Sequence, residues 1–264
     1  MKFTNRISRF LAFVLPLSFA IAATSCDNDD DDKKATPKPA EPVPAQLHVN
    51  FDHQVNGQPL EFNTREYTNA AGNTYNVTLL KYYISNVTLT NSETGEVFKE
   101  KDSYHLINPT ESKSSFTLKD LPSKKFDHLS FAIGIDSAAN LSTDQPGDLN
   151  PNNDMAWNWN TGYVFVKFEG NNIKPNAADN RAVLLHVGHN ANYKTVTFPI
   201  NGGVTFAADR IFNANLRVDA NALLEGPNVI DFNTLTNVMG GPNAAKIAEN
   251  YSDGMFSLHE VKQQ

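Results

Sequence analysis

The chain has 264 residues, a formal net charge of −7 and one cysteine. This acidic balance argues against nucleic acid as a partner and against direct adhesion to an anionic lipid surface, because both attract basic proteins. The length leaves room for one large core after an N-terminal leader and a linker.

The N-terminus has the parts of a bacterial export signal. Lys2, Arg6 and Arg9 form a basic start, and an apolar run follows over residues 10–23. This run is shorter than the roughly 20 residues that a transmembrane helix needs, and it fits the apolar region of a signal peptide. It leads into "ATSC", which resembles the cleavage and lipidation site of a bacterial lipoprotein. We expect residues 1–25 to be removed and Cys26 to carry lipid. The alternative is a cleaved signal with an incidental cysteine.

Residues 26–45 are typical of a tether. The acidic block "DNDDDDKK" stays solvated, and the proline-rich stretch "ATPKPAEPVPA" favours an extended conformation. About twenty residues at about 3.1 Å each would hold the domain on the order of 60 Å from the bilayer. An acidic run directly after the cysteine also resembles surface-export signals of Gram-negative lipoproteins. We therefore expect a lipid-anchored protein at the outer membrane or cell surface, with the leaflet left open.

The remainder, residues 46–264, reads as one β-rich domain. In residues 46–53, Leu47, Val49, Phe51 and His53 alternate with polar residues, as in a half-buried strand. Residues 75–90 are rich in β-branched and aromatic side chains, and Tyr75, Val77, Leu79, Tyr83, Val87 and Leu89 share one parity. Further strands are predicted over 103–107, 126–135, 162–169, 182–189, 194–200 and 211–220. A helix is predicted over 242–251, where Pro242 stands near the start. This order predicts an all-β fold, an antiparallel β-sandwich with long loops and one short helix near the C-terminus.

The loop over residues 136–154 is dense in oxygen ligands. Asp148, Asn150 and Asn152 have the spacing of a calcium loop's opening, and Asp154 follows two residues later. The central glycine and the closing glutamate of that pattern are absent, since Asn153 and Trp159 occupy those positions. A calcium site formed by these four residues is one hypothesis, and a surface loop built from Asx turns is the other.

Both tryptophans of the chain, Trp157 and Trp159, lie in the segment "MAWNWNTGYVF". Such a pair is consistent with a core cap, a ligand shelf or a metal site. If Cys26 is lipidated, no thiolate remains, so zinc or copper sites with cysteine ligands and cysteine nucleophiles are excluded. Seven histidines are the remaining nitrogen ligands: His48, His53, His105, His128, His186, His189 and His259. Strand parity places His128 toward water, and it places His186 opposite Val183, Leu185 and Val187.

The segments around these residues resemble the MbnP-like domain, a family named for a periplasmic copper-binding protein associated with methanobactin. The resemblance covers most of residues 46–256. Its most specific part is the tryptophan segment with the downstream "HVG", and it includes "FDHQVNGQPLEF", "LLKYYISNVTL", "GDLNPNND" and "KIAENYSDGMF".

The resemblance implies a copper site. In copper-binding relatives a partner di-haem oxidase converts a tryptophan to kynurenine, which joins histidines around the metal. Carried over, this implies Trp157 or Trp159 as the oxidised residue, His186 as the best imidazole and Met155 as a soft neighbour. Those relatives carry a histidine near the position of Asn140. Either a ligand is missing in this chain, or His48, His53 or His189 replaces it, with His53 or His48 as the preferred residue.

Two other functions remain open from the sequence. A surface lipoprotein would bind glycans if the indoles formed an exposed shelf beside Asp154, Asn158 and Asn160. A structural or adhesive domain without a small ligand is the third reading. No GxSxG, HExxH or phosphate-loop motif occurs, so we expect no enzyme activity and assign any chemistry at the tryptophans to a partner.

Overall fold

The computed structural model describes residues 41–157 and 162–264. The predicted leader, the lipidation site Cys26, the tether as far as Ala40, and Trp159 with Asn158 and Asn160 lie outside the described residues. Glu41–Gln264 forms one unit. The Val43 amide donates to the Asp209 carboxylate at 2.9 Å, and the Asp209 amide donates to the Val43 carbonyl at 2.8 Å. No helix in this part is both long and apolar enough to cross a bilayer.

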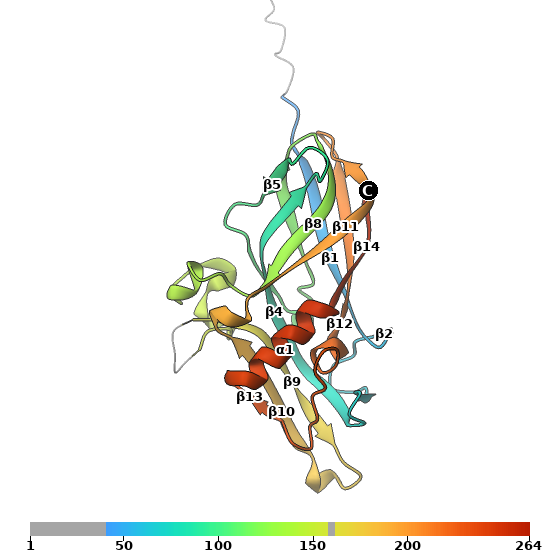
Figure 1. The fold of residues 1–264 in the computed structure, drawn as a ribbon, viewed down its shortest axis with the longest axis vertical. Coiled ribbons are helices and arrows are strands. Elements are labelled where there is room, and N and C mark those ends of the chain that lie inside the picture. The colour runs from blue at the N-terminus through green and yellow to red at the C-terminus, as the bar shows by residue number, and fades with distance from the viewer. Residues whose placement is uncertain (1–40, 158–161) are drawn as a thin grey trace, which may run out of the picture. The chain divides into compact units, whose positions relative to one another are not determined.

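Two sheets form the domain (Figure 1). The smaller sheet runs β14-β12-β1-β2, with β7 also paired to β1. Its strands are β1 (Ala45–Val55), β2 (Gln58–Pro59), β7 (Ser115–Leu121), β12 (Ile211–Asp219) and β14 (Phe256–Gln263). The larger sheet runs β11-β8-β4-β9-β10-β13, with β3, β5 and β6 also paired to β4. Its strands are β3 (Tyr67–Thr68), β4 (Thr74–Thr90), β5 (Val97–Lys99), β6 (Tyr104–Ile107), β8 (Lys125–Ile133), β9 (Val164–Ile173), β10 (Arg181–Gly188), β11 (Lys194–Thr205) and β13 (Asn237–Val238).

The predicted all-β sandwich with a late helix is confirmed, and its helix is α1 (Gly241–Asp253). Two details of the prediction were wrong. The sheets are mixed, because β1 pairs with β12 and β10 pairs with β13 in parallel. The C-terminal residues around His259, where no strand was predicted, form strand β14, which pairs with β12. Alternation of buried and exposed residues identifies a strand, but it does not report the direction of the strand's neighbours.

The main core lies between the two sheets and under α1. From β1 it takes Leu47, Val49 and Phe51, as the alternation predicted. The face predicted for β4 is confirmed at both ends of the strand, where Tyr75, Val77, Val87 and Leu89 lie in the main core. It was wrong at Leu79 and Tyr83, because register shifts after Val77 and after Ser85 exchange the faces of the residues between them. The bulged strand therefore sends Tyr82 into the main core and Tyr83 to the opposite face.

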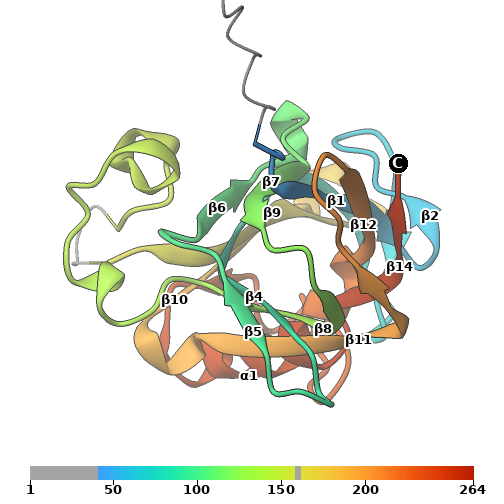
Figure 2. The same ribbon diagram turned by 90° about the horizontal axis from the view of Figure 1, so that it is seen from above.

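The opposite face of the larger sheet carries a second apolar cluster, here named the loop core. Its members are Tyr83, Leu106, Ile135, Leu149, Met155, Trp157, Tyr163, Val164 and Phe165. The covering loop runs from residue 136 to 157 and contains three short 3₁₀ turns, η2 (Ala139–Leu141), η3 (Gly147–Leu149) and η4 (Pro151–Asn153). This loop, yellow-green in Figures 1 and 2, projects to the side away from β2 and β14. Met155, Ala156 and Trp157 form the end of this loop.

Candidate functional site

Trp157 is fixed where the covering loop returns to the sheet. Ala156 and Tyr163 form a β-bridge, and the Trp157 amide donates to the Gly162 carbonyl at 3.0 Å. The indole lies against Gly188 at the end of β10: a Cβ on that glycine would stand 2.9 Å from both Cζ2 and Nε1 of the indole. Gly188 thus provides the space that the indole occupies. Trp157 is 8% exposed, so it does not offer the open face that a sugar-stacking shelf requires.

His189 stacks on the Trp157 indole. The ring centroids are 5.8 Å apart and the ring planes differ by 17°. The backbone of His189 has φ 70° and ψ 144°, a conformation that is strained for a residue with a side chain. Within residues 41–157 and 162–264 no hydrogen bond engages its ring, whereas the rings of His53, His105 and His186 each have one. Strain that holds an uncommitted imidazole beside an indole is the pattern expected of a functional position.

His186 contributes to the same site from β10. With Trp157, Lys167 and Met239 it lines a cavity of about 260 Å³, here named the Trp157 cavity; Asp154, Ala156 and Val164 complete the lining. His186 Nε2–H donates to Glu169 at 2.8 Å. Burial lowers the pKa of His186, and the nearby Lys167 ammonium lowers it further, while the Glu169 hydrogen bond opposes both. The imidazole is therefore neutral at pH 7, with one nitrogen engaged by Glu169.

A buried ammonium attaches the loop to the sheet beside this cavity. The Lys167 side chain is 9% exposed, and its Nζ lies 2.5 Å from Asp154 Oδ2 and 3.8 Å from Glu169 Oε1. Lys167 also donates to the Asp154 carbonyl at 3.2 Å, and on the neighbouring strand Lys81 donates to the Asn153 carbonyl at 3.3 Å. Two lysines on adjacent strands thus hold consecutive carbonyls of the segment that leads to Trp157.

The other predicted copper ligands lie elsewhere. His48 and His53 are on β1 of the smaller sheet, and neither lines the Trp157 cavity. His53 Nε2 pairs with the Tyr82 hydroxyl at 2.8 Å, and burial lowers the pKa of His53 to about 4. Met155 belongs to the loop core, where it is fully buried. The structure therefore brings His186 to Trp157 in the lining of the cavity, and it stacks His189 on the same indole outside that lining. Met155 shares the loop core with Trp157 and does not line the cavity.

Three of the four residues of the predicted calcium loop, Asp148, Asn150 and Asp154, use side-chain oxygens in bonds within the protein. Asp148 accepts from the Leu106 amide at 2.8 Å and from Lys113 Nζ at 2.6 Å. The Asn150 side chain caps η4 by accepting from the Asn152 amide at 2.9 Å, and Asp154 pairs with Lys167. No group of three or more His, Cys, Asp or Glu side chains in the described ranges is placed to hold a metal ion. The loop oxygens order the loop by bonds within the protein.

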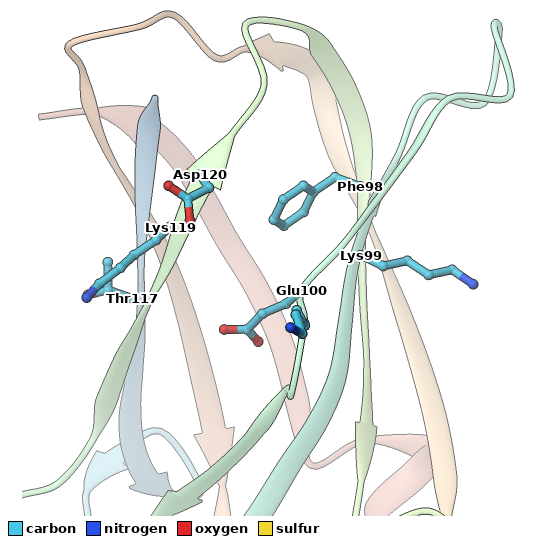
Figure 3. Close-up of a pocket in the computed structure, with 7 residues that line it drawn as sticks. Phe98, Lys99, Glu100, Thr117, Lys119 and Asp120 are labelled. Carbon is cyan, nitrogen blue, oxygen red and sulfur yellow. The ribbon is translucent and has the colours of Figure 1, made fainter. Parts of the chain in front are cut away.

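A larger cavity of about 380 Å³ lies between the edge strands β5 and β7 (Figure 3). Phe98 and Glu100 extend into this space, whereas Lys99 extends away from it. The carboxylate of Glu100 already accepts from Ser103 at 2.5 Å and from His105 at 2.7 Å. None of the predicted site residues lines this cavity, so the Trp157 cavity is the better candidate site.

A family model for MbnP matches residues 44–240. The chain belongs to the MbnP family. Among solved structures, MbnP from Methylosinus trichosporium matches with a TM-score of 0.52 and 15% sequence identity, over 83% of this chain and 98% of that chain. At this identity the match establishes a shared fold. No curated protein matches the chain.

For this MbnP family member the sequence predicts His186 as the first imidazole ligand of copper. His189 is predicted only as one of three replacements for the histidine that is absent at Asn140. The sequence signal for His189 is the motif "HVGH", in which His186 and His189 flank the glycine on which the indole lies. Asn140, at the position where the resemblance implies a histidine, accepts from the Tyr163 amide at 2.8 Å and donates to Asn190 at 2.8 Å. Asn140 therefore bonds to Tyr163 and Asn190 near the site, and its side-chain amide has a structural role there.

Proposed function

We propose that this protein handles copper at the cell envelope, and that its metal site forms around Trp157 and His189. The observation that carries the proposal is the His189 imidazole, stacked on the indole by a strained backbone and free of hydrogen bonds to described residues. Imidazole is a suitable copper ligand. Family membership supports the same choice, because the copper-binding relatives use histidine and an oxidised tryptophan.

The donor set fits copper better than a hard cation. The ring of His189 and the neutral ring of His186 supply nitrogen, while the carboxylates nearby are paired with Lys167 or His186. An oxidised Trp157 would add a further donor in place of the histidine that Asn140 replaces. We propose that a partner di-haem oxidase carries out that oxidation.

Metal titration of the purified protein tests the proposal. Wild-type protein should bind one copper ion. His189→Asn should weaken binding at least about tenfold, because even the loss of a hydrogen-bond partner behind a metal ligand typically costs about 10- to 100-fold in affinity. The matched control is His259→Asn, which removes an exposed imidazole of β14. Equal copper affinities for the wild type and His189→Asn would overturn the site assignment.

The intact mass of mature protein from its native host tests the modification. A mass increase that disappears in Trp157→Phe and persists in Trp159→Phe would assign the oxidation to Trp157. An unmodified wild-type chain would show that the indole itself, and not kynurenine, lines the site.

Lipid attachment at Cys26 is the proposed means of localisation. Cell fractionation of Cys26→Ala should release the protein from the membrane fraction, because a lipid tail anchors a domain without spanning the bilayer. Retention of the variant in that fraction would exclude this anchor.

A further inference from the structure

Met239 stands at the edge of the Trp157 cavity. It directly follows β13, which pairs in parallel with β10 through Leu184–Asn237 and Leu185–Val238. The same register carries Met239 to the level of His186 on β10. Met239 lines the cavity together with Trp157 and His186, and its side chain packs partly buried against the loop core.

The residue after Met239, Gly240, lies beside the His189 imidazole. A Cβ on Gly240 would stand 3.2 Å from Nε2 of His189, so the absence of a side chain keeps this nitrogen accessible. Gly240 has φ 144°, which favours glycine at this position. The Cα atoms of Met239 and Gly240 are one trans peptide apart, about 3.8 Å. A thioether and an imidazole nitrogen therefore border the same indole.

The other methionines of the described part are placed differently. Met155 is fully buried in the loop core, and Met255 is 1% exposed in the main core. Among the methionines of residues 41–157 and 162–264, Met239 alone lines the Trp157 cavity. This placement differs from the soft neighbour expected from the sequence, which was Met155.

We infer that Met239 is a thioether ligand of the copper site and gives it a preference for reduced copper. The inference rests on the proposed function and names a ligand of that same site. Thioethers are soft ligands that select Cu(I), whereas imidazole accepts either oxidation state. With Asn140 in place of a histidine, His189 and Met239 supply a nitrogen and a sulfur donor, and both residues border the Trp157 indole.

Met239→Leu tests this inference, because leucine keeps the side-chain volume with little loss of stability. The variant should bind Cu(I) about tenfold more weakly than the wild type, while its Cu(II) affinity stays unchanged. Met155→Leu is the matched control and should leave both affinities unchanged. X-ray absorption of the Cu(I) protein should detect a sulfur neighbour at roughly 2.3 Å, the distance known for zinc–sulfur bonds, and Met239→Leu should lose it.

The outcomes separate the two proposals. If Met239→Leu binds Cu(I) as the wild type does while His189→Asn binds weakly, the Met239 assignment fails and the proposed function stands. If the wild type binds neither Cu(I) nor Cu(II), both fail. Equal weakening of Cu(I) and Cu(II) in Met239→Leu would assign the residue a packing role and overturn the thioether ligand.

Discussion

Replacing Gly188 with alanine tests the packing that places Trp157. The added Cβ would lie 2.5 Å from the Tyr163 carbonyl oxygen and 2.9 Å from two indole atoms, both far inside ordinary contact distance. The indole cannot simply rotate away, since Trp157 is part of the loop core and its amide is bonded to Gly162. We expect a loss of about 3 kcal/mol, the upper part of the usual range for overpacking, because one obstructing atom belongs to the backbone.

Urea unfolding followed by tryptophan fluorescence measures this loss, and thermal melts should show a midpoint lower by about 6–12 °C for a domain of this size. Gly254→Ala is the matched control, because no atom lies within 4 Å of its Cβ position and its φ of −146° suits alanine. The control should change stability by no more than about 1 kcal/mol. A Gly188→Ala protein with wild-type midpoint and fluorescence would refute the packing of the indole on Gly188.

Three further predictions concern stability. The pKa of His53 is lowered from 6.5 to about 4 in the folded protein, so the unfolded chain takes up the proton first and stability should fall by about 3 kcal/mol as pH drops from 6.5 to 4. His53→Gln should flatten this dependence in urea titrations, and His259→Gln should not. Lys167→Met should lower the free energy of unfolding by about 2 kcal/mol, because charged hydrogen bonds to the loop are lost. The control Lys262→Met, at an exposed ion pair, should change it by less than about 1 kcal/mol. Equal effects of the two substitutions would contradict the role of Lys167 in attaching the loop to the sheet. Calcium should leave the melting midpoint unchanged, since side-chain oxygens of Asp148, Asn150 and Asp154 have protein partners. A gain near 2.7 kcal/mol at a hundredfold excess over the dissociation constant would instead support the calcium site.

Strand positions could be predicted from the sequence, because burial on one face imposes the alternation seen in β1 and β10. The same reasoning placed His186 correctly on the outer face of β10, opposite residues of the main core. It failed in the middle of β4, where one register shift inverts the alternation and a second restores it, without a distinctive sequence mark. A bulge is a property of two paired strands, so one strand's pattern does not reveal it.

The candidate site was predicted in part for a similar reason. Trp157 could be selected by its rarity and its motif, and His186 by parity. His189 and Met239 could not, because both lie just beyond strand ends, where no periodicity applies and the backbone turns through positive φ at His189 and Gly240. Their proximity depends on β13 pairing with β10, a contact between residues about fifty positions apart that local sequence does not encode.

Anomalous diffraction at the copper absorption edge, from crystals of the copper-loaded protein, tests the central proposal most directly. The proposal predicts one strong peak beside Trp157, roughly 2 Å from a ring nitrogen of His189, as judged from zinc–imidazole bonds. Copper peaks confined to other histidines, such as His105 or His128, with none beside Trp157, would contradict it.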